Sequence, residues 1–252
     1  MKEIKRDIYL NRLINRKENG LIKIVTGIRR CGKSYLLDPL FKNHLIENGV
    51  KEDHIIKLEL DKIENEEYHN ASKLNEFIKS KIKDKNMYYI LLDEIQLVDG
   101  FESVLNGFLY ERNLDVYVTG SNSKFLSSDI ITEFRDRGDE VKVFPLSFSE
   151  YVEAFNGDKY EGWNEYILFG GLPLILSKKT NEEKSKYLKK LFDQTYIKDI
   201  VERNNVQRVD ILDSVINMLA SSVGSLTNPK KMYDTFVSNG EKEISINTVN
   251  TY

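Results

Sequence analysis

Residues 21–34 read LIKIVTGIRRCGKS, and this stretch decides the fold. An apolar run rich in β-branched residues precedes a loop from Gly27 to Gly32, and Lys33 and Ser34 then open an amphipathic segment. A strand, a G-x-x-x-x-G-K-[ST] loop and a helix in this order are typical of a phosphate-binding loop. The glycines let backbone N–H groups turn toward a phosphate, and the helix N-terminus adds partial positive charge.

The loop is predicted to hold the phosphates of a nucleotide. Lys33 reaches the β- and γ-phosphates, and the Ser34 hydroxyl ligates Mg²⁺. The Arg29 and Arg30 side chains contact phosphates, a neighbouring acid or only solvent, and the sequence does not choose between these. The predicted cofactor-binding residues are Gly27, Ile28, Arg29, Arg30, Cys31, Gly32, Lys33, Ser34 and Tyr35.

A second motif, YYILLDE at residues 88–94, is an apolar strand that ends in two acids. Asp93 is predicted to orient Mg²⁺ through a bound water. Glu94 is predicted to accept the proton of the attacking water. Because a further strand is expected at residues 54–60, this strand is the third in sequence. One strand is then expected between it and the strand that precedes the phosphate-binding loop.

Strands and helices alternate over the first 148 residues. Apolar runs predict five strands, and amphipathic stretches between them predict helical crossovers. This alternation predicts an α/β P-loop NTPase fold, with a five-stranded parallel sheet and helices on both faces. The strands are expected at 21–27, 54–60, 88–94, 115–121 and 141–147, and the helices at 34–48, 71–84, 101–111 and 123–134.

After Pro145 the pattern becomes helical. We expect an ATPase core at residues 1–148, an α-helical lid at 149–207 and a partial winged helix at 208–252. The sequence ends inside the last expected helix without a polar tail, so we expect a C-terminally truncated chain.

Further site candidates follow the fourth strand. Ser121 and Asn122 are predicted to hold the attacking water or touch the γ-phosphate. Arg137, with Arg135 as second choice, is predicted to act as an arginine finger, in cis or in trans. A solvated charged loop is the alternative for both arginines.

In the helical half, Arg203 and Arg208 are candidate sensors, with ordinary helix-surface pairing favoured instead. Before the loop, Tyr9, Leu10 and Leu13 share one helical face. This face forms either the floor of an adenine site or part of the core.

Composition limits the other functions. The chain has 252 residues, a net charge of −3, three histidines and one cysteine, Cys31. A Cys-based or His-rich metal site is therefore excluded. No apolar run is long enough for a membrane span, and we expect a cytoplasmic protein. Residues 196–252 carry six Lys or Arg against seven Asp or Glu. Protein contact is therefore favoured over DNA binding for the expected winged helix.

Five motifs in order make the chain resemble a known family. They are TGIRRCGKS at 26–34, LLDEIQ at 91–96, TGSNS at 119–123, FPLSFSEY at 144–151 and GGLP at 170–173. Together they are similar to the bacterial and archaeal AAA-type ATPase family that carries a C-terminal domain of unknown function. The resemblance implies an AAA+-like core, a helical lid and a winged helix, with the domain of unknown function after them and so missing from this chain. The family's Gly-Arg before the fifth strand reads Asp136-Arg137 here.

The sequence thus predicts an ATPase that hydrolyses Mg-ATP and couples this to a conformational change in its C-terminal part. The chain lacks N-K-x-D and D-x-x-G, so ATP is favoured over GTP. The alternative is a nucleotide-gated regulatory switch with little turnover that binds DNA or a protein partner. A small-molecule kinase is the weakest hypothesis. A homo-oligomer is possible under each of these.

Overall fold

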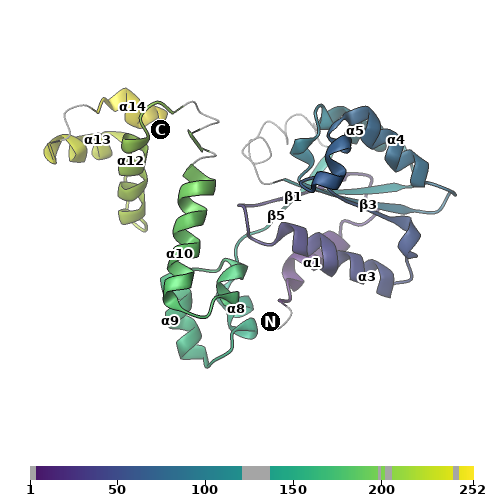
Figure 1. Ribbon diagram of the computed structural model, residues 1–252, viewed down its shortest axis with the longest axis horizontal. Coiled ribbons are helices and arrows are strands. Elements are labelled where there is room, and N and C mark those ends of the chain that lie inside the picture. The colour runs from purple at the N-terminus through teal and green to yellow at the C-terminus, as the bar shows by residue number, and fades with distance from the viewer. Residues whose placement is uncertain (1–3, 121–136, 198–199, 202–205, 241–243) are drawn as a thin grey trace. The chain divides into compact units, whose positions relative to one another are not determined.

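The computed structural model describes residues 4–120, 137–197, 200–201, 206–240 and 244–252. The elements group into two compact units, residues 1–185 and 186–252 (Figure 1). The division falls inside helix α10, which runs from Asn181 to Leu191. The two units are described one at a time below.

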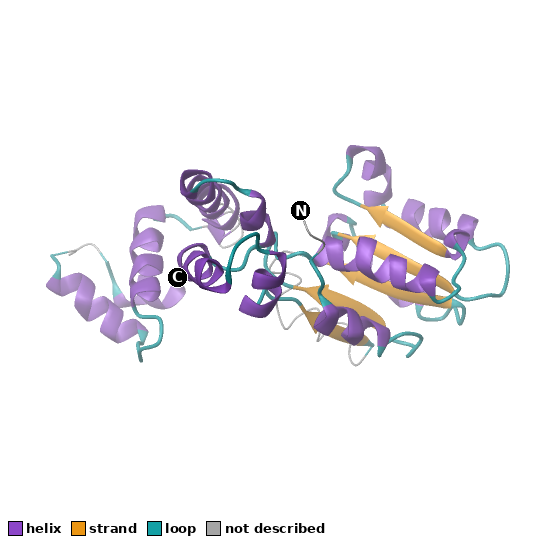
Figure 2. Ribbon diagram, turned by 90° about the horizontal axis from the view of Figure 1, so that it is seen from below, coloured by secondary structure: helices purple, strands orange, loops and turns teal. Residues whose placement is uncertain are grey.

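The first unit is built on a five-stranded parallel sheet, shown as orange arrows in Figure 2. The strand order is β2-β3-β4-β1-β5, and every neighbouring pair is parallel. The predicted fold class is therefore confirmed, as is the single strand, β4, between β1 and β3. The strands are β1 Ile22–Thr26, β2 Ile55–Glu59, β3 Tyr88–Asp93, β4 Leu114–Thr119 and β5 Gly138–Lys142.

Helices cover both faces of this sheet, as Figure 1 shows. Helices α4 (Ala71–Lys81) and α5 (Phe101–Phe108) pack on one apolar cluster, which includes Ile24, Ile90 and Val118. Helix α1 (Asp7–Ile14) and the segment after the phosphate-binding loop pack on the other cluster. Strands β1 and β3 are buried along their whole length, because both of their faces are covered.

The helix predicted for residues 34–48 is interrupted. Helix α2 (Lys33–Tyr35) leads into the π-helix η1 (Leu36–Phe41), and α3 (Lys42–Glu47) follows. Asp38 has an extended backbone, with φ −142° and ψ 118°. The cause is Pro39, because a proline ring disfavours the helical conformation of the residue before it.

The fifth strand begins and ends earlier than the predicted 141–147. Among the described strands, β5 pairs only with β1. It is polar, so its apolar pattern is weak, and Val141 is its one buried residue. The Val143 N–H still donates to Thr26 O at 2.8 Å. The chain then leaves the sheet, since Pro145 has no N–H and the Leu146 N–H donates to Gly171 O instead, at 2.7 Å.

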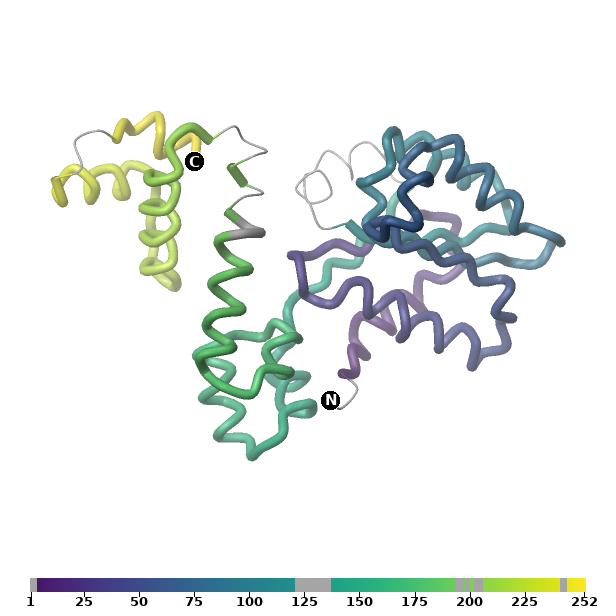
Figure 3. The backbone as a smooth tube through the Cα atoms, viewed as in Figure 1, coloured from purple at the N-terminus to yellow at the C-terminus, as the bar shows by residue number. Residues whose placement is uncertain are grey.

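Helices follow the sheet in the first unit, and Figure 3 traces the chain through them. Helices α8 (Phe148–Ala154) and α9 (Lys159–Phe169) each begin with a capping box, at Ser147 and Asp158. The turn η5 (Pro173–Ser177) precedes α10. Three further 3₁₀ helices of the same unit are η2 (Glu52–His54), η3 (Ile63–His69) and η4 (Ile95–Leu97).

In its described part the second unit is helical. After the turn η6 (Phe192–Ile197) come α12 (Val209–Ser221), α13 (Pro229–Ser238) and α14 (Ile246–Thr251). These last three helices share a small core of six buried residues, Ile211, Val215, Met232, Phe236, Ile244 and Val249. The winged helix stays a prediction.

Candidate nucleotide-binding site

The phosphate-binding loop follows β1 at the carboxyl edge of the sheet, and Gly27 fixes its start. Gly27 has φ +146°, and a Cβ atom there would lie 2.2 Å from Val143 O. No other residue fits this approach, since both the conformation and the space require glycine. Cys31 is fully buried behind the loop, and burial raises the pKa of its thiol, so this side chain packs rather than reacts.

Lys33 lies inside the loop at the start of α2. Its side chain is buried, and Nζ donates to Gly27 O at 3.0 Å and to Ile28 O at 3.1 Å. The ammonium group is thus fixed within the turn of backbone that a phosphate would enter. The neighbouring Ser34 side chain lies close enough to Asp93, at the end of β3, to lower the pKa of that carboxyl, and both residues line the same cavity.

Thr119, at the end of β4, links the two acids of the second motif. Its hydroxyl donates to Asp93 Oδ1 at 2.5 Å and accepts from the Glu94 N–H at 3.0 Å. Burial raises the pKa of Asp93, the Thr119 and Ser34 hydroxyls lower it, and the charges of Glu94 and Asp61 raise it. The pKa lies above its ordinary value, because burial is the largest of these effects.

The Ser34 and Asp93 oxygens fit a magnesium ion. Both are hard oxygen donors, and Mg²⁺ commonly takes one or two protein ligands together with waters and phosphates. In the described part of the chain no group of three or more His, Cys, Asp or Glu residues could hold a metal. A site with few protein ligands suits a metal that arrives with a nucleotide.

Glu94 has a left-handed backbone, with φ 57° and ψ 47°. This conformation is uncommon for a residue other than glycine and costs free energy, so it persists where the surroundings hold it. The Thr119 hydroxyl holds its N–H, and the Gln96 amide donates to its Oε2. Glu94 lines the same cavity as Lys33.

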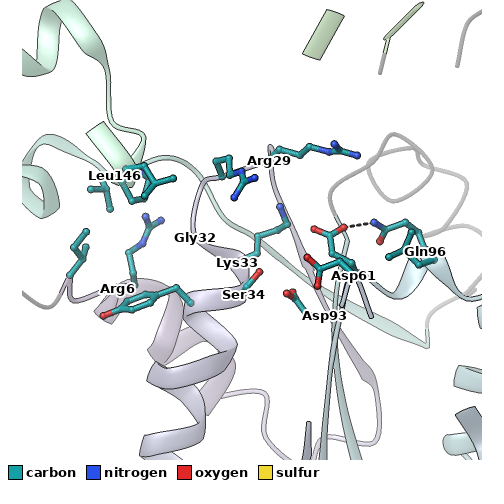
Figure 4. A pocket seen from close by; sticks show the side chains of 16 residues that line it. Arg6, Arg29, Gly32, Lys33, Ser34, Asp61, Asp93, Gln96 and Leu146 are labelled. Atoms are coloured by element: carbon teal, nitrogen blue, oxygen red, sulfur yellow. Dashed lines mark hydrogen bonds between the residues drawn. The ribbon is translucent and has the colours of Figure 1, made fainter. Parts of the chain in front are cut away.

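The two motifs and the loop line one cavity of about 840 Å³. Figure 4 shows Lys33, Ser34 and Asp93 gathered at its centre, with Arg6 and Leu146 toward one end and Asp61 and Gln96 toward the other. The lining thus combines a polar phosphate side with an apolar wall. The residues are Ile4, Arg6, Arg29, Arg30, Gly32, Lys33, Ser34, Tyr35, Asp61, Asp93, Glu94, Gln96, Leu97, Leu146, Pro173 and Leu174.

Gly171 positions the apolar wall. A Cβ atom on Gly171 would lie 2.2 Å from Leu146 O, so only glycine allows the two backbones to approach this closely. Pro173 and Leu174 follow directly and line the cavity with Leu146. The GGLP stretch, one of the five motifs quoted from the sequence, therefore shapes the site.

Arg6 joins the segments around this wall. Its guanidinium is 2% exposed, donates to Phe144 O at 2.6 Å and Cys31 O at 3.4 Å, and lies 3.2 Å from Glu150 Oε1. One side chain thus connects the N-terminal segment, the phosphate-binding loop and α8. Sequence reasoning missed Arg6, because an arginine among other N-terminal charges belongs to no motif.

Other candidate residues lie elsewhere. Ser121, Asn122, Arg135 and Arg203 fall outside the described residues. Arg208 pairs with Asp210 at 2.6 Å in the second unit. Tyr9 and Leu13 are buried in the core cluster under α1, and Leu10 packs against it. None of these three lines the cavity.

Arg137 lies at the opposite edge of the sheet from the loop. Its carbonyl accepts from the Ile22 N–H at 2.9 Å, at the amino end of the parallel pair β1 and β5. Its exposed guanidinium donates to Asn106 Oδ1 at 3.2 Å. The length of β1 therefore separates this arginine from the phosphate-binding loop of its own chain.

The residues that sequence reasoning missed share a feature. Thr119, Gln96 and Asp61 reach the site from strand ends and turns. Thr119 and Gln96 stand in the quoted TGSNS and LLDEIQ stretches, where neither was given a role, and Asp61 belongs to no motif. Thr119 is the first residue of the TGSNS stretch at 119–123. Its position at the end of a predicted strand was the feature that could have identified it as a site residue. The apolar wall is made of Leu146, Pro173 and Leu174, and such residues do not by themselves indicate a binding site.

Comparisons with known proteins agree with this architecture. A family model described as an AAA domain matches residues 19–152, and a model of a domain of unknown function matches residues 160–252. The latter domain covers the segments in which we expect the lid and the winged helix, rather than following them. None of the described helices combines the length and apolar character that crossing a membrane requires.

Two relatives are described only as uncharacterized proteins. The one from Haemophilus influenzae is 34% identical over 241 residues, which cover 93% of this chain and 60% of the relative. The one from Methanocaldococcus jannaschii is 29% identical over 259 residues, which cover 94% of this chain and 55% of the relative. The chain therefore spans less than two thirds of the length of either relative.

Among solved structures, a Walker-type ATPase of Pyrococcus abyssi is similar, with a TM-score of 0.60 and 16% identity over 93% of this chain and 89% of that chain. This likeness supports the fold. The AAA-domain model covers more than half of the 252 residues, including both motifs and the whole sheet. The chain therefore belongs to the AAA-type family of P-loop ATPases, with a domain of unknown function following its AAA domain.

Proposed function

We propose that this protein binds Mg-ATP, hydrolyses it to ADP and phosphate, and couples the reaction to a movement of its C-terminal helices. The observation that carries the proposal is the meeting of Lys33, Ser34, Asp93 and Glu94 at one cavity, from two separate places in the sequence. These are the groups that phosphoryl transfer to water needs: a phosphate clamp, a metal site and a base.

In binding, the loop backbone N–H groups and Lys33 receive the phosphates. Lys33 exchanges its two carbonyl partners for phosphate oxygens, which are stronger acceptors because they are charged. The adenine ring of the nucleotide lies along the apolar wall of Leu146, Pro173 and Leu174. ATP is proposed over GTP, since the chain lacks the N-K-x-D motif.

Ser34 and Asp93 would hold the magnesium ion, Ser34 directly and Asp93 through water. When bound, the ion neutralises charge on the β- and γ-phosphates. Asp93 is already oriented for this role by the Thr119 hydroxyl.

In hydrolysis, Glu94 accepts a proton from a water molecule while the oxygen of that water attacks the γ-phosphorus atom. The bond from phosphorus to the bridging oxygen breaks, and ADP leaves with that oxygen. Ser121 and Asn122 are proposed to hold the water. Arg137 is proposed to neutralise the transferring group on a neighbouring copy, because it lies at the far edge of its own sheet.

A nucleotide-gated switch with little turnover is the second candidate function. The lining of the cavity favours this switch. Pro173 and Leu174 come from the helical segment beyond the sheet and would contact a bound nucleotide directly. In this case a DNA or protein partner of the C-terminal helices would receive the signal. We also propose the domain boundaries after residues 148 and 207, with a lid between them and a partial winged helix after residue 207.

Phosphate release from Mg-ATP, measured for the wild type beside Glu94→Gln with parallel nucleotide-binding titrations, tests the proposal. We expect a rate that falls by about 10²-fold or more in the variant while affinity is kept. Binding without turnover in the wild type would leave the switch as the function. An unchanged rate in Glu94→Gln would remove Glu94 as the base.

A further inference from the structure

Gln96 donates a hydrogen bond from its side-chain amide to Oε2 of Glu94, as the dashed line in Figure 4 marks. Both residues line the cavity. The bond joins residues two positions apart, so it reflects how the turn after β3 is built rather than a chance approach of distant segments.

The turn that carries Gln96 is anchored. Ile95 is fully buried and Val98 is 2% exposed, so the core holds the residues on both sides of this position. The Leu97 N–H donates to Glu94 O at 3.1 Å, and the Val98 N–H donates to Ile95 O at 2.9 Å. The amide of Gln96 therefore approaches Glu94 from a rigid support.

The hydrogen bonding of Gln96 argues against a stabilising role. Its Oε1 atom is buried and has no hydrogen-bond partner among the described residues. Leaving a buried carbonyl unpaired costs about as much free energy as a hydrogen bond to a charged group supplies. An apolar side chain of the same size would therefore serve the fold about equally well.

The chemistry of the bond suits a base. The backbone N–H of Glu94 is held by the Thr119 hydroxyl, and Gln96 contacts its side chain. A neutral amide donor restricts that side chain through one oxygen without neutralising the carboxylate, as a lysine or arginine would.

We propose that Gln96 is a positioning residue for the hydrolytic step, orienting the Glu94 carboxylate toward the attacking water. The proposal rests on the proposed role of Glu94 as the base. It predicts that Gln96 contributes to turnover through Glu94, with little effect on nucleotide binding or on fold stability.

Gln96→Met tests this, since methionine keeps the length of the side chain and removes the donor. We expect kcat to fall about tenfold, less than the about 10²–10⁴-fold that a general base contributes. KM, ADP affinity and the unfolding temperature should stay at wild-type values. Gln96→Glu, which replaces the donor by a like charge, should lose at least as much activity. Gln207→Met is the matched control, because Gln207 is exposed and lies in the second unit.

The double variant Glu94→Gln/Gln96→Met separates the possible failures. If Gln96 acts through Glu94, adding Gln96→Met to Glu94→Gln causes no further loss of rate. Wild-type turnover in Glu94→Gln would overturn the proposed function and this inference together. If Glu94→Gln is slow but Gln96→Met turns over normally, lowers affinity instead, or acts equally in both backgrounds, only the role of Gln96 is overturned.

Discussion

Thr119 Oγ1 lies 2.5 Å from Asp93 Oδ1 and 3.0 Å from the Glu94 nitrogen, so one hydroxyl on β4 holds both acids that end β3. The bond to Asp93 restrains the proposed magnesium ligand, and the bond to Glu94 supports a left-handed backbone. The site is therefore braced across two neighbouring strands.

Thr119→Val keeps the shape of the side chain and removes both hydrogen bonds. Because a buried N–H and a buried carboxylate lose a partner, we expect the free energy of unfolding to fall by about 1–3 kcal/mol. Magnesium-dependent ATP affinity should fall as well, as measured by titration at several Mg²⁺ concentrations. Thr119→Ser retains the hydroxyl and should stay near the wild type. Equal loss in both variants would assign the effect to packing.

Lys33→Ala should abolish nucleotide binding. The ammonium group lies in the loop within 3.1 Å of two carbonyls, where the phosphates would enter, and charged hydrogen bonds contribute about 1.5–3 kcal/mol each. Fluorescent ATP or ADP titration should show at least about a 100-fold loss of affinity. Lys42→Ala on α3 is the control and should bind normally. Retained affinity in Lys33→Ala would place the phosphates elsewhere.

Arg137→Ala should lower turnover more than affinity, by about 10³-fold if the residue acts as an arginine finger. Because Arg137 lies at the far edge of its own sheet, mixing Arg137→Ala with inactive Lys33→Ala should restore part of the phosphate release. One copy then supplies the nucleotide site and the other supplies the arginine. Arg112→Ala is an exposed control. No recovery on mixing, or an unchanged rate in Arg137→Ala, would assign Arg137 to a solvated loop.

Lys23 and Asp115 form a buried ion pair at the amino edge of the sheet, with exposed side-chain fractions of 0% and 2%. Burial lowers the pKa of Lys23 and the charge of Asp115 raises it, and Lys23 Nζ also donates to Leu21 O at 2.8 Å. Lys23→Met leaves Asp115 buried without its cation. We expect about 3–5 kcal/mol less stability in chemical denaturation.

The double variant Lys23→Met/Asp115→Leu should recover part of this loss, since an apolar pair needs no compensation. Nucleotide affinity at the other edge should not change in folded protein. A single variant as stable as the wild type would show that water reaches Asp115.

The sequence was sufficient to predict the elements whose conformation depends on their own residues. The phosphate-binding loop and the acidic end of β3 were located correctly, because glycine spacing and an apolar strand each encode a local geometry. Strand β5 was placed too late, since an edge strand reading GDEVK has almost no apolar pattern. The helix after the loop was predicted without its break at Pro39.

The rest of the site depends on approaches between distant residues. Arg6 meets Phe144 and Glu150 across most of the first unit, and Leu146 meets Gly171. Such pairs leave no periodic trace, so a single sequence cannot reveal them. The same holds for Thr119, whose role depends on which strand lies beside β4.

The hydrogen bond from the Leu146 N–H to Gly171 O joins the segment after the sheet to the segment that carries Pro173 and Leu174. Leu146, Pro173 and Leu174 all line the cavity beside it. A bound ligand would therefore raise the work needed to peel α9 and η5 away from the sheet. By reciprocity, a pull on these helices would weaken the hold on the ligand by the same free energy. A pulling force on α9 and η5 would then weaken ligand binding without any change in the phosphate-binding loop.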